Sequence, residues 1–125
     1  MFDRVLLAVG VLFLSSCAGF AAKDCPIEPY DIDKVEQAIE ATSSCKAAYD
    51  LMNTCRRNSG SDVGLARVVI AKCEKVFVTR GDGPRMRAYS QERAACVAKY
   101  AKEQGTMYAS FQATCEARAA VRAAR

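Results

Sequence analysis

The sequence contains no histidine and no tryptophan among its 125 residues. Without histidine, the chain lacks the usual general base of Cys-His and Ser-His hydrolases and the commonest ligand of zinc and haem sites. No two cysteines are separated by only two residues, so a thioredoxin-like redox motif is not indicated. A glycine-rich phosphate-binding loop is also missing. These absences predict a protein that is not an enzyme and that needs neither a metal nor a cofactor.

Carboxylate pairs can hydrolyse glycosides without histidine, so the acidic residues need a separate assessment. Glu92, Glu103 and Glu116 stand among charged neighbours on the predicted outer faces of helices. Such residues belong to solvated surface far more often than to an active site, and we expect all three to be solvated.

Long apolar runs are missing as well, apart from the ten residues Val5 to Leu14. This run is too short for a membrane span, which needs ~20 residues, and it follows Arg4 in the layout of a secretory signal peptide. Two cleavage sites compete. Residues 14–17, Leu-Ser-Ser-Cys, resemble a bacterial lipobox, in which residues 1–16 are removed and Cys17 is acylated; alternatively, a peptidase cuts after Ala21. The first predicts a lipoprotein of the periplasm or outer membrane.

Cysteine is the residue that the chain has in unusual number, with seven copies. Cleavage after Ala21 removes Cys17 from the chain, and cleavage at the lipobox leaves it acylated. In both cases Cys17 does not take part in a disulfide. An even set then remains in an exported chain of this size, which predicts three disulfides. Each bridge contributes ~2–4 kcal/mol, which compensates for a modest core. The six residues are Cys25, Cys45, Cys55, Cys73, Cys96 and Cys115.

The rest of the chain predicts helices only, because apolar residues recur at intervals of three and four in segments rich in Ala, Glu, Lys and Arg. We expect an all-α fold, a small antiparallel bundle of helical hairpins, over residues 31–125. An extended segment, 17–30, precedes it. The predicted breaks between helices lie at 56–62, at 79–85 and near Gly105, while residues 41–44 form either a short turn or an uninterrupted passage.

Several residues have the chemistry of helix ends. Asp33 and Glu36 have the spacing of a capping box at the start of the first helix. Ser61 or Asp62 is suited to cap the helix after the 56–62 break. Gly105 is predicted to terminate one helix as its C′ residue, and Thr106 to begin the last helix.

The cysteine spacing suggests which helices are bridged, because residues equidistant from a turn lie level in a helical hairpin. Cys96 and Cys115 lie nine and ten residues from Gly105, which predicts a bridge between them. Cys45 and Cys73 are each fourteen residues from Ser59, which also fits. Cys25 and Cys55 then remain, and they can meet only if the chain bends near 41–44. Six cysteines allow fifteen connectivities, so the last two pairings stay open.

Charge is unevenly distributed along the chain, whose net charge is +4. Residues 23–62 carry 5 Lys or Arg against 8 Asp or Glu, whereas residues 63–125 carry 12 against 5. Near the end of the chain, Arg118, Arg122 and Arg125 line one side of the last helix. The pattern is consistent with dipole-complementing helix ends or with two surfaces for two partners.

The segment 91–122 is similar to the C-terminal part of the LprI-like family of small exported proteins. The resemblance is carried by Arg93-x-x-Cys96, by Gly105-Thr106 nine residues after Cys96, and by Cys115 ten residues after Gly105. It covers about a quarter of the chain, and the first half departs from the family pattern. The resemblance implies a helical, disulfide-bonded protein of the envelope, and the family's namesake is a lysozyme-inhibiting lipoprotein.

These observations predict a lipoprotein that binds a protein or cell-wall partner, with lysozyme as the first candidate. The alternative is a structural or adaptor protein whose basic half contacts anionic cell-wall or lipid components. The membrane contact is expected through the lipid anchor, and no nucleic-acid partner is expected in this compartment.

The intact mass of the membrane-extracted protein tests the leader and the bridges together. We expect the mass of residues 17–125 plus acyl groups, less six hydrogens for three disulfides. Reduction should restore the hydrogens, and a control with Cys17→Ser should remain uncleaved at this site. A mass equal to residues 22–125 would contradict the lipobox.

Overall fold

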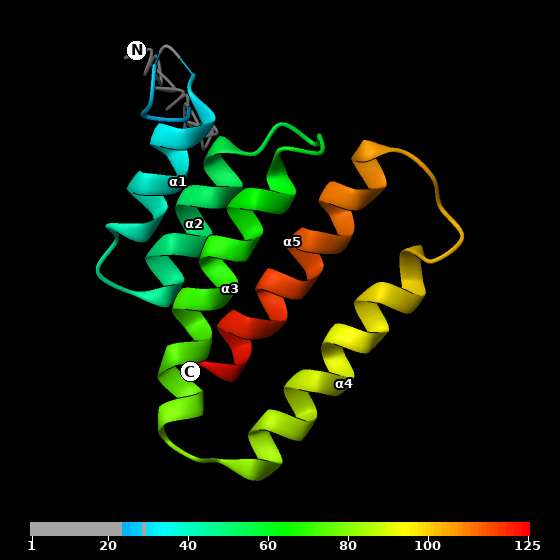
Figure 1. Cartoon of the computed structure of the whole chain (residues 1–125). Coiled ribbons are helices and arrows are strands. Elements are labelled where there is room, and N and C mark those ends of the chain that lie inside the picture. The colour runs from blue at the N-terminus through cyan, green and yellow to red at the C-terminus, as the bar shows by residue number, and fades with distance from the viewer. Residues whose placement is uncertain (1–23, 29) are drawn as a thin grey trace, which may run out of the picture.

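The structure, a computed structural model, describes residues 24–28 and 30–125. In this part of the chain there are five α-helices and no strand, which confirms the all-α expectation (Figure 1). The helices are α1 (Ile32–Glu40), α2 (Cys45–Cys55), α3 (Asp62–Thr79), α4 (Gly83–Tyr100) and α5 (Thr106–Ala123). Signal residues 1–16, Cys17 and the alternative cut after Ala21 lie outside the described residues. None of the described helices combines the length and apolarity needed to cross a membrane.

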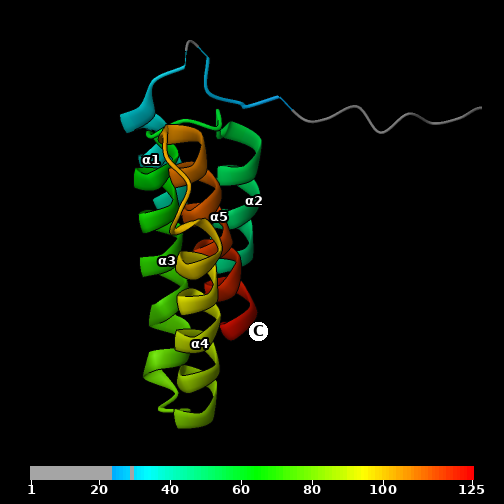
Figure 2. The ribbon, with the colours of Figure 1, turned by 90° about the vertical axis from the view of Figure 1, so that its right-hand side faces the viewer.

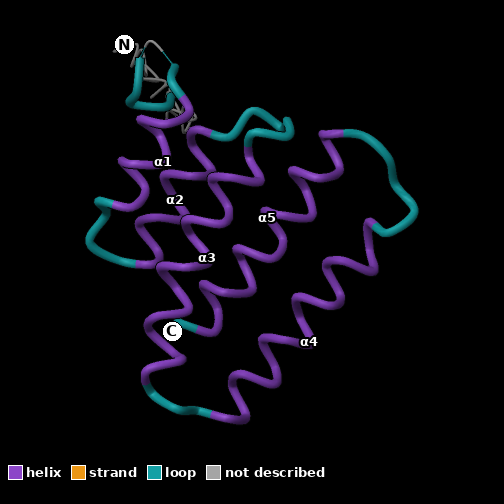
Figure 3. Tube along the Cα trace, in the orientation of Figure 1, coloured by secondary structure: helices purple, strands orange, loops and turns teal. Residues whose placement is uncertain are grey.

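The helices run alternately up and down, and α5 occupies the middle of the bundle (Figures 1 and 2). It packs most extensively on α3, then on α4, and also contacts α2. The short helices α1 and α2 cover the other side of α3. Helices α3 and α4 touch only slightly, and Figure 3 shows them joined by a loop at one end while α4 and α5 are joined by a loop at the opposite end.

The core forms where the apolar stripes of these helices meet. The stripe of α3 recurs every four residues at Leu65, Val69 and Cys73, all fully buried. Against it, α5 presents small side chains, which allow its backbone to approach α3 closely. The buried residues of α5 are Ser110, Ala117, Ala119, Ala120, Val121 and Ala123.

The start of α1 differs from the sequence-based expectation. Asp31, and not Asp33, is the N-cap, and its Oδ1 accepts hydrogen bonds from the main-chain N–H groups of Asp33 (3.0 Å) and Lys34 (3.3 Å). Glu36 does not complete a capping box. Its carboxylate lies over Gly64 of α3, so that a larger residue at position 64 would require the end of the Glu36 side chain to move. Tertiary packing therefore uses the carboxylate that the local pattern assigned to a cap.

The segment 41–44 is a turn that reverses the chain between α1 and α2. Ser44 caps α2 by accepting a hydrogen bond from the N–H of Ala47 at 3.1 Å. The helix is therefore interrupted at 41–44 by a short turn, which is one of the two alternatives that the sequence left open. This bend brings Cys55 back toward the start of the described chain.

Asp62 is the first residue of α3, yet its side chain does not cap that helix. It is 1% exposed and accepts hydrogen bonds from the main-chain N–H groups of Arg57 (3.0 Å) and Ser59 (3.1 Å) in the preceding loop. The hydroxyl of Ser110 in α5 donates a third bond at 2.6 Å. Ser61, the N-cap residue, makes no side-chain capping bond. The expectation of a Ser61 or Asp62 cap is therefore wrong: the buried carboxylate closes the loop and joins α3 to α5.

Gly105 does not terminate α4, which ends at Tyr100, five residues earlier. Short-range bonds finish that helix, including the one from the N–H of Glu103 to the carbonyl of Tyr100 at 3.0 Å. Gly105 instead precedes α5 with φ of 110°, a conformation that residues with a Cβ rarely adopt. Thr106 begins the last helix, as expected.

Three disulfides staple the described residues: Cys25–Cys55, Cys45–Cys73 and Cys96–Cys115. The Cys96–Cys115 prediction is confirmed, and the other two bridges are the pairs that the spacing left open. The first ties the segment before α1 to the end of α2, the second ties α2 to α3, and the third ties α4 to α5. Within the described residues, no bridge joins the α1–α3 part to the α4–α5 part.

The buried carboxylate of Asp62 is expected to be a major determinant of stability. Asp62→Ala leaves two loop N–H groups without their acceptor, and we expect the free energy of unfolding to fall by about 3 kcal/mol. Ser110→Ala removes one bond and should cost about 1 kcal/mol. Urea unfolding measures both.

Asp50→Ala is the matched control, because this carboxylate pairs with Lys46 on the exposed surface of α2. It should change the free energy of unfolding by no more than about 0.5 kcal/mol. The role assigned to Asp62 is refuted if Asp62→Ala and Asp50→Ala prove equally mild.

Candidate functional site

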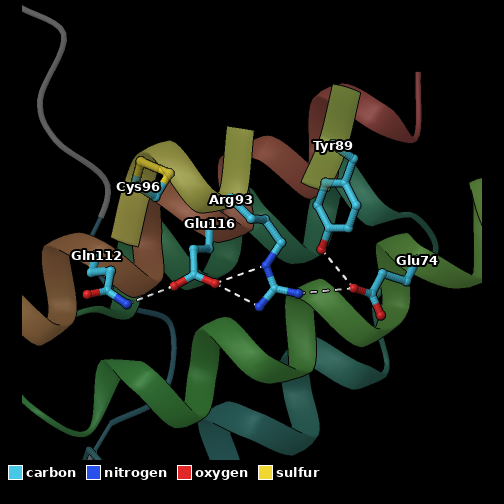
Figure 4. A network of polar contacts seen from close by, with 7 residues as sticks. Glu74, Tyr89, Arg93, Cys96, Gln112 and Glu116 are labelled. Carbon is cyan, nitrogen blue, oxygen red and sulfur yellow. Dashed lines mark hydrogen bonds and ion pairs between the residues drawn. A yellow bond between two sulfur atoms is a disulfide. The ribbon is translucent and has the colours of Figure 1, made fainter. Parts of the chain in front are cut away.

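A polar network around Arg93 links three helices (Figure 4). Arg93 of α4 donates two hydrogen bonds to Oε2 of Glu116 in α5, from Nε at 2.9 Å and from Nη2 at 2.7 Å. Its Nη1 lies 3.5 Å from Oε1 of Glu74 in α3. Tyr89 donates its hydroxyl to the same Glu74 oxygen at 2.7 Å, and Gln112 donates to Glu116 at 3.0 Å.

The burial of this network contradicts one expectation from the sequence. Only 12% of the Glu116 side chain is exposed, so Glu116 is an ion-paired, mostly buried residue and not part of the solvated surface. Glu92 also has a partner, Arg122 of α5 at 2.8 Å, although both side chains remain nearly half exposed. Glu103 is exposed, as expected.

The burial of Tyr89 shows that its part of the network is shielded from solvent. The tyrosine is buried and packs edge-to-face on Phe77 of α3 with ring centroids 4.9 Å apart. Burial, followed by the hydrogen bond to Glu74, raises the pKa of Tyr89 well above its ordinary value, while Arg93 opposes the rise. The network therefore contains a neutral phenol and a cation between two carboxylates, and none of its buried side-chain polar atoms lacks a hydrogen-bond partner. Its geometry suits holding α4 against α3 and α5 rather than binding a ligand.

The residues that carry the family resemblance do not form one site. Arg93 is in the network, and Cys96, one turn later, is bridged to Cys115. Gly105 lies exposed in the loop before α5, and Thr106 lies exposed in the first turn of α5. A hollow of about 260 Å³ does open beside Arg93 between α3 and α5. Its lining residues are Val63, Ala66, Arg67, Ile70, Arg93, Gln112, Ala113 and Glu116.

The outward side of α5 forms a second candidate site, which we call the basic groove. It consists of two hollows that share Arg118, one of about 330 Å³ between α2 and α5 and one of about 290 Å³ between α4, α5 and the end of α2. The lining residues of the first are Lys46, Tyr49, Asp50, Arg118, Val121, Arg122 and Arg125. Those of the second are Arg56, Lys99, Tyr100, Phe111, Thr114, Cys115 and Arg118.

Positive charge dominates the basic groove. Six cations line it, against the carboxylate of Asp50 in its wall and that of Glu92 paired to Arg122. The two ion pairs, Lys46–Asp50 and Arg122–Glu92, are both exposed and each contributes little to stability. Among the described residues, no carboxylate lies within 4.0 Å of the charged nitrogens of the remaining four cations, which are Arg56, Lys99, Arg118 and Arg125.

The arginines of α5 were identifiable from the sequence as one side of a helix, but the other cations of the groove were not. Lys46 and Arg56 come from the two ends of α2, and Lys99 comes from the last turn of α4. Only the packing of α2 and α4 on either side of α5 brings them to the same surface. The spacing of residues within one helix does not indicate which residues of other helices will lie beside it, so these three cations could not be assigned to the groove from the sequence.

A third surface is acidic and belongs to α1 and the segment before it. Residues 24–28 and 30–40 contain six acidic residues and one basic residue, Lys34. Asp24, Glu28, Asp33 and Glu40 are exposed there. Helix α1 does not contact α5, so this acidic surface and the basic groove are separate parts of the molecule.

The described residues contain no group of three or more His, Cys, Asp or Glu side chains placed to hold a metal ion. In comparisons with known proteins, no family model, curated protein or solved structure matches the chain.

The Tyr89 hydroxyl predicts a specific loss of stability at alkaline pH. Because its pKa is higher in the folded state than the value of ~10 in the unfolded state, its contribution is complete below about pH 10 and is lost as the pH rises further. We expect the free energy of unfolding to decline above pH 10, and Tyr89→Phe to make that decline shallower. Urea unfolding across this pH range measures the slopes, with Tyr108→Phe, outside the network, as the control. Equal slopes for the wild type and Tyr89→Phe would contradict the prediction.

Proposed function

We propose that the chain is a small binding module of the bacterial envelope, exported by residues 1–16 and held to a membrane by a lipid on Cys17. Three disulfides in a domain of this size are typical of proteins that mature in an oxidising compartment, which supports export. The resemblance of the Arg93–Cys115 hairpin to the LprI-like family supports the same location. In this proposal the protein binds a macromolecule and does not turn over a substrate.

The observation that carries the proposal is the gathering of six cations in the basic groove, on a part of the molecule separate from the acidic residues of α1. An acidic surface on α1 and a basic groove on α5, without a contact between the two helices, are suited to different partners. Electrostatic complementarity of this kind governs which partner associates and how fast. A purely structural role would not require cations without a carboxylate partner to be gathered in one groove.

The first candidate partner is lysozyme, a cationic protein, and the acidic surface of α1 is the part suited to it. Exposed Asp33 and Glu40 lie at the two ends of α1, whose inner residues Val35 and Ile39 are buried against the core. The backbone of α1 is therefore held by the core, so that only the exposed carboxylate side chains need ordering on binding.

A muramidase assay tests this candidate. We use the soluble mature chain with Cys17→Ser, and we expect it to inhibit lysozyme. Replacing both Asp33→Asn and Glu40→Gln should weaken inhibition by at least about tenfold, the equivalent of 1.4 kcal/mol. The control is Arg118→Gln with Arg122→Gln, which changes the same number of charges on the basic groove and should leave inhibition intact. Absence of inhibition at large molar excess rejects lysozyme as the partner.

The second candidate is an adaptor that contacts anionic cell-wall or lipid components, and the basic groove favours it. Sedimentation with peptidoglycan or with anionic vesicles, repeated at increasing salt, distinguishes this role from inhibition, because exposed electrostatic contacts weaken as salt screens them. Binding that salt does not weaken would contradict a role for the groove.

A further inference from the structure

The shape of the basic groove restricts what it can bind. Its two hollows lie in line along α5 and share Arg118, while α2 and α4 form the walls. Between Phe111 and the end of α5 at Ala123 the groove follows the helix for about 18 Å, at 1.5 Å per residue, and Arg125 lies two residues beyond that end. A long concave surface between helices receives a linear chain better than the flat plane of a lipid headgroup layer, which would reach the walls before the floor.

The cations are distributed along this length and not gathered at one point. Arg118 and Arg122 are one turn apart on α5, which places their Cβ atoms about 5–6 Å apart, and Arg125 lies just beyond the end of the helix. On the α2 wall, Lys46 and Arg56 are separated by about 15 Å along the helix. A single small anion could meet only a few of these charges. A ligand that uses them all must carry repeated negative charges along a chain.

The kinds of side chain indicate the chemistry of those charges. Four of the six cations are arginines, whose planar guanidinium groups donate paired N–H bonds to phosphate oxygens. Half-buried Tyr49, Tyr100 and Phe111 line the same two hollows and offer apolar surface to the uncharged links of a polymer. Guanidinium and apolar side chains in one groove suit a chain in which phosphates are joined by short organic units.

We propose that the basic groove binds a linear phosphodiester polymer, with successive phosphates held by the arginines of α5 and by Lys46, Arg56 and Lys99 of the walls. This inference deepens the second candidate role above, and it rests on that role for the envelope as the source of the polymer. The geometry of the groove itself is independent of export and of the lipid anchor.

Counterion release predicts how strongly binding depends on salt. If about four phosphates are neutralised, affinity should fall by about 50-fold between 50 and 200 mM salt, from a slope of ~0.7 per phosphate on a flexible single chain. Removing two of the contacting arginines should reduce that slope by about 1.4.

The test uses the full mature chain with Cys17→Ser and a synthetic poly(glycerol phosphate), a linear phosphodiester, as the probe, with affinity measured by calorimetry. Arg118→Gln with Arg122→Gln should lower affinity at least tenfold and reduce the salt slope. The matched control is Arg80→Gln with Arg87→Gln, two exposed arginines at the α3–α4 end that do not line the groove. Both double variants make the same change in net charge, and circular dichroism confirms that each is folded.

Three results would overturn the inference. Equal losses in the two double variants would show that net charge, and not the groove, binds the probe. Binding of poly-glutamate as tightly as poly(glycerol phosphate) would remove the preference for phosphate. Tighter binding to anionic phospholipid vesicles than to the polymer would identify a membrane surface as the ligand. Binding to vesicles, or retained inhibition of lysozyme, would leave the proposed function as an envelope binding module standing. Failure of the polymer inference is therefore distinguishable from failure of the proposed function.

Discussion

The packing of α5 against α3 is the contact on which the rest of the molecule depends. The disulfides Cys25–Cys55 and Cys45–Cys73 tie together the chain up to α3, and Cys96–Cys115 ties α4 to α5. Apart from the main-chain connection between α3 and α4, only noncovalent contacts join these two parts within the described residues. Small side chains on α5 allow the two helices to approach closely, and the Ser110–Asp62 bond at 2.6 Å aligns them at one end. Burial of this seam supplies the apolar stabilisation that links the two parts.

Placing α5 in the middle also determines where the surfaces of the protein lie. The inner side of α5 packs against α3, so its outer side forms the floor of a groove whose walls are α2 and α4. Helix α4 has little contact with α3, and Arg93 holds it through Glu116 and Glu74. The Arg93 network therefore serves the architecture, whereas the groove cations that have no carboxylate partner among the described residues are available to a ligand. Acidic α1, on the far side of α3, is kept apart from them.

Much of the fold could be predicted from local patterns, and the failures share one cause. The all-α class, the turn at 41–44 as one of two alternatives, and the Cys96–Cys115 bridge followed from helical periodicity and hairpin symmetry. Asp33, Glu36 and Gly105 were assigned to helix ends by local rules, yet Asp31 caps α1, Glu36 packs over Gly64, and α4 ends before Gly105. In each case a tertiary contact or an earlier hydrogen bond superseded the local rule.

By itself, the sequence determined the helical class and the even set of six cysteines, because both depend on residues near one another along the chain or on simple counting. It also indicated the arginine side of α5, since spacing on one helix is a local property. Only the tertiary structure decided that Glu116 is buried against Arg93, that Asp62 meets Ser110, and that Lys46, Arg56 and Lys99 join Arg118 in one groove. Those placements depend on which helix faces cross in space, and neither composition nor periodicity specifies how helices far apart in the chain are packed.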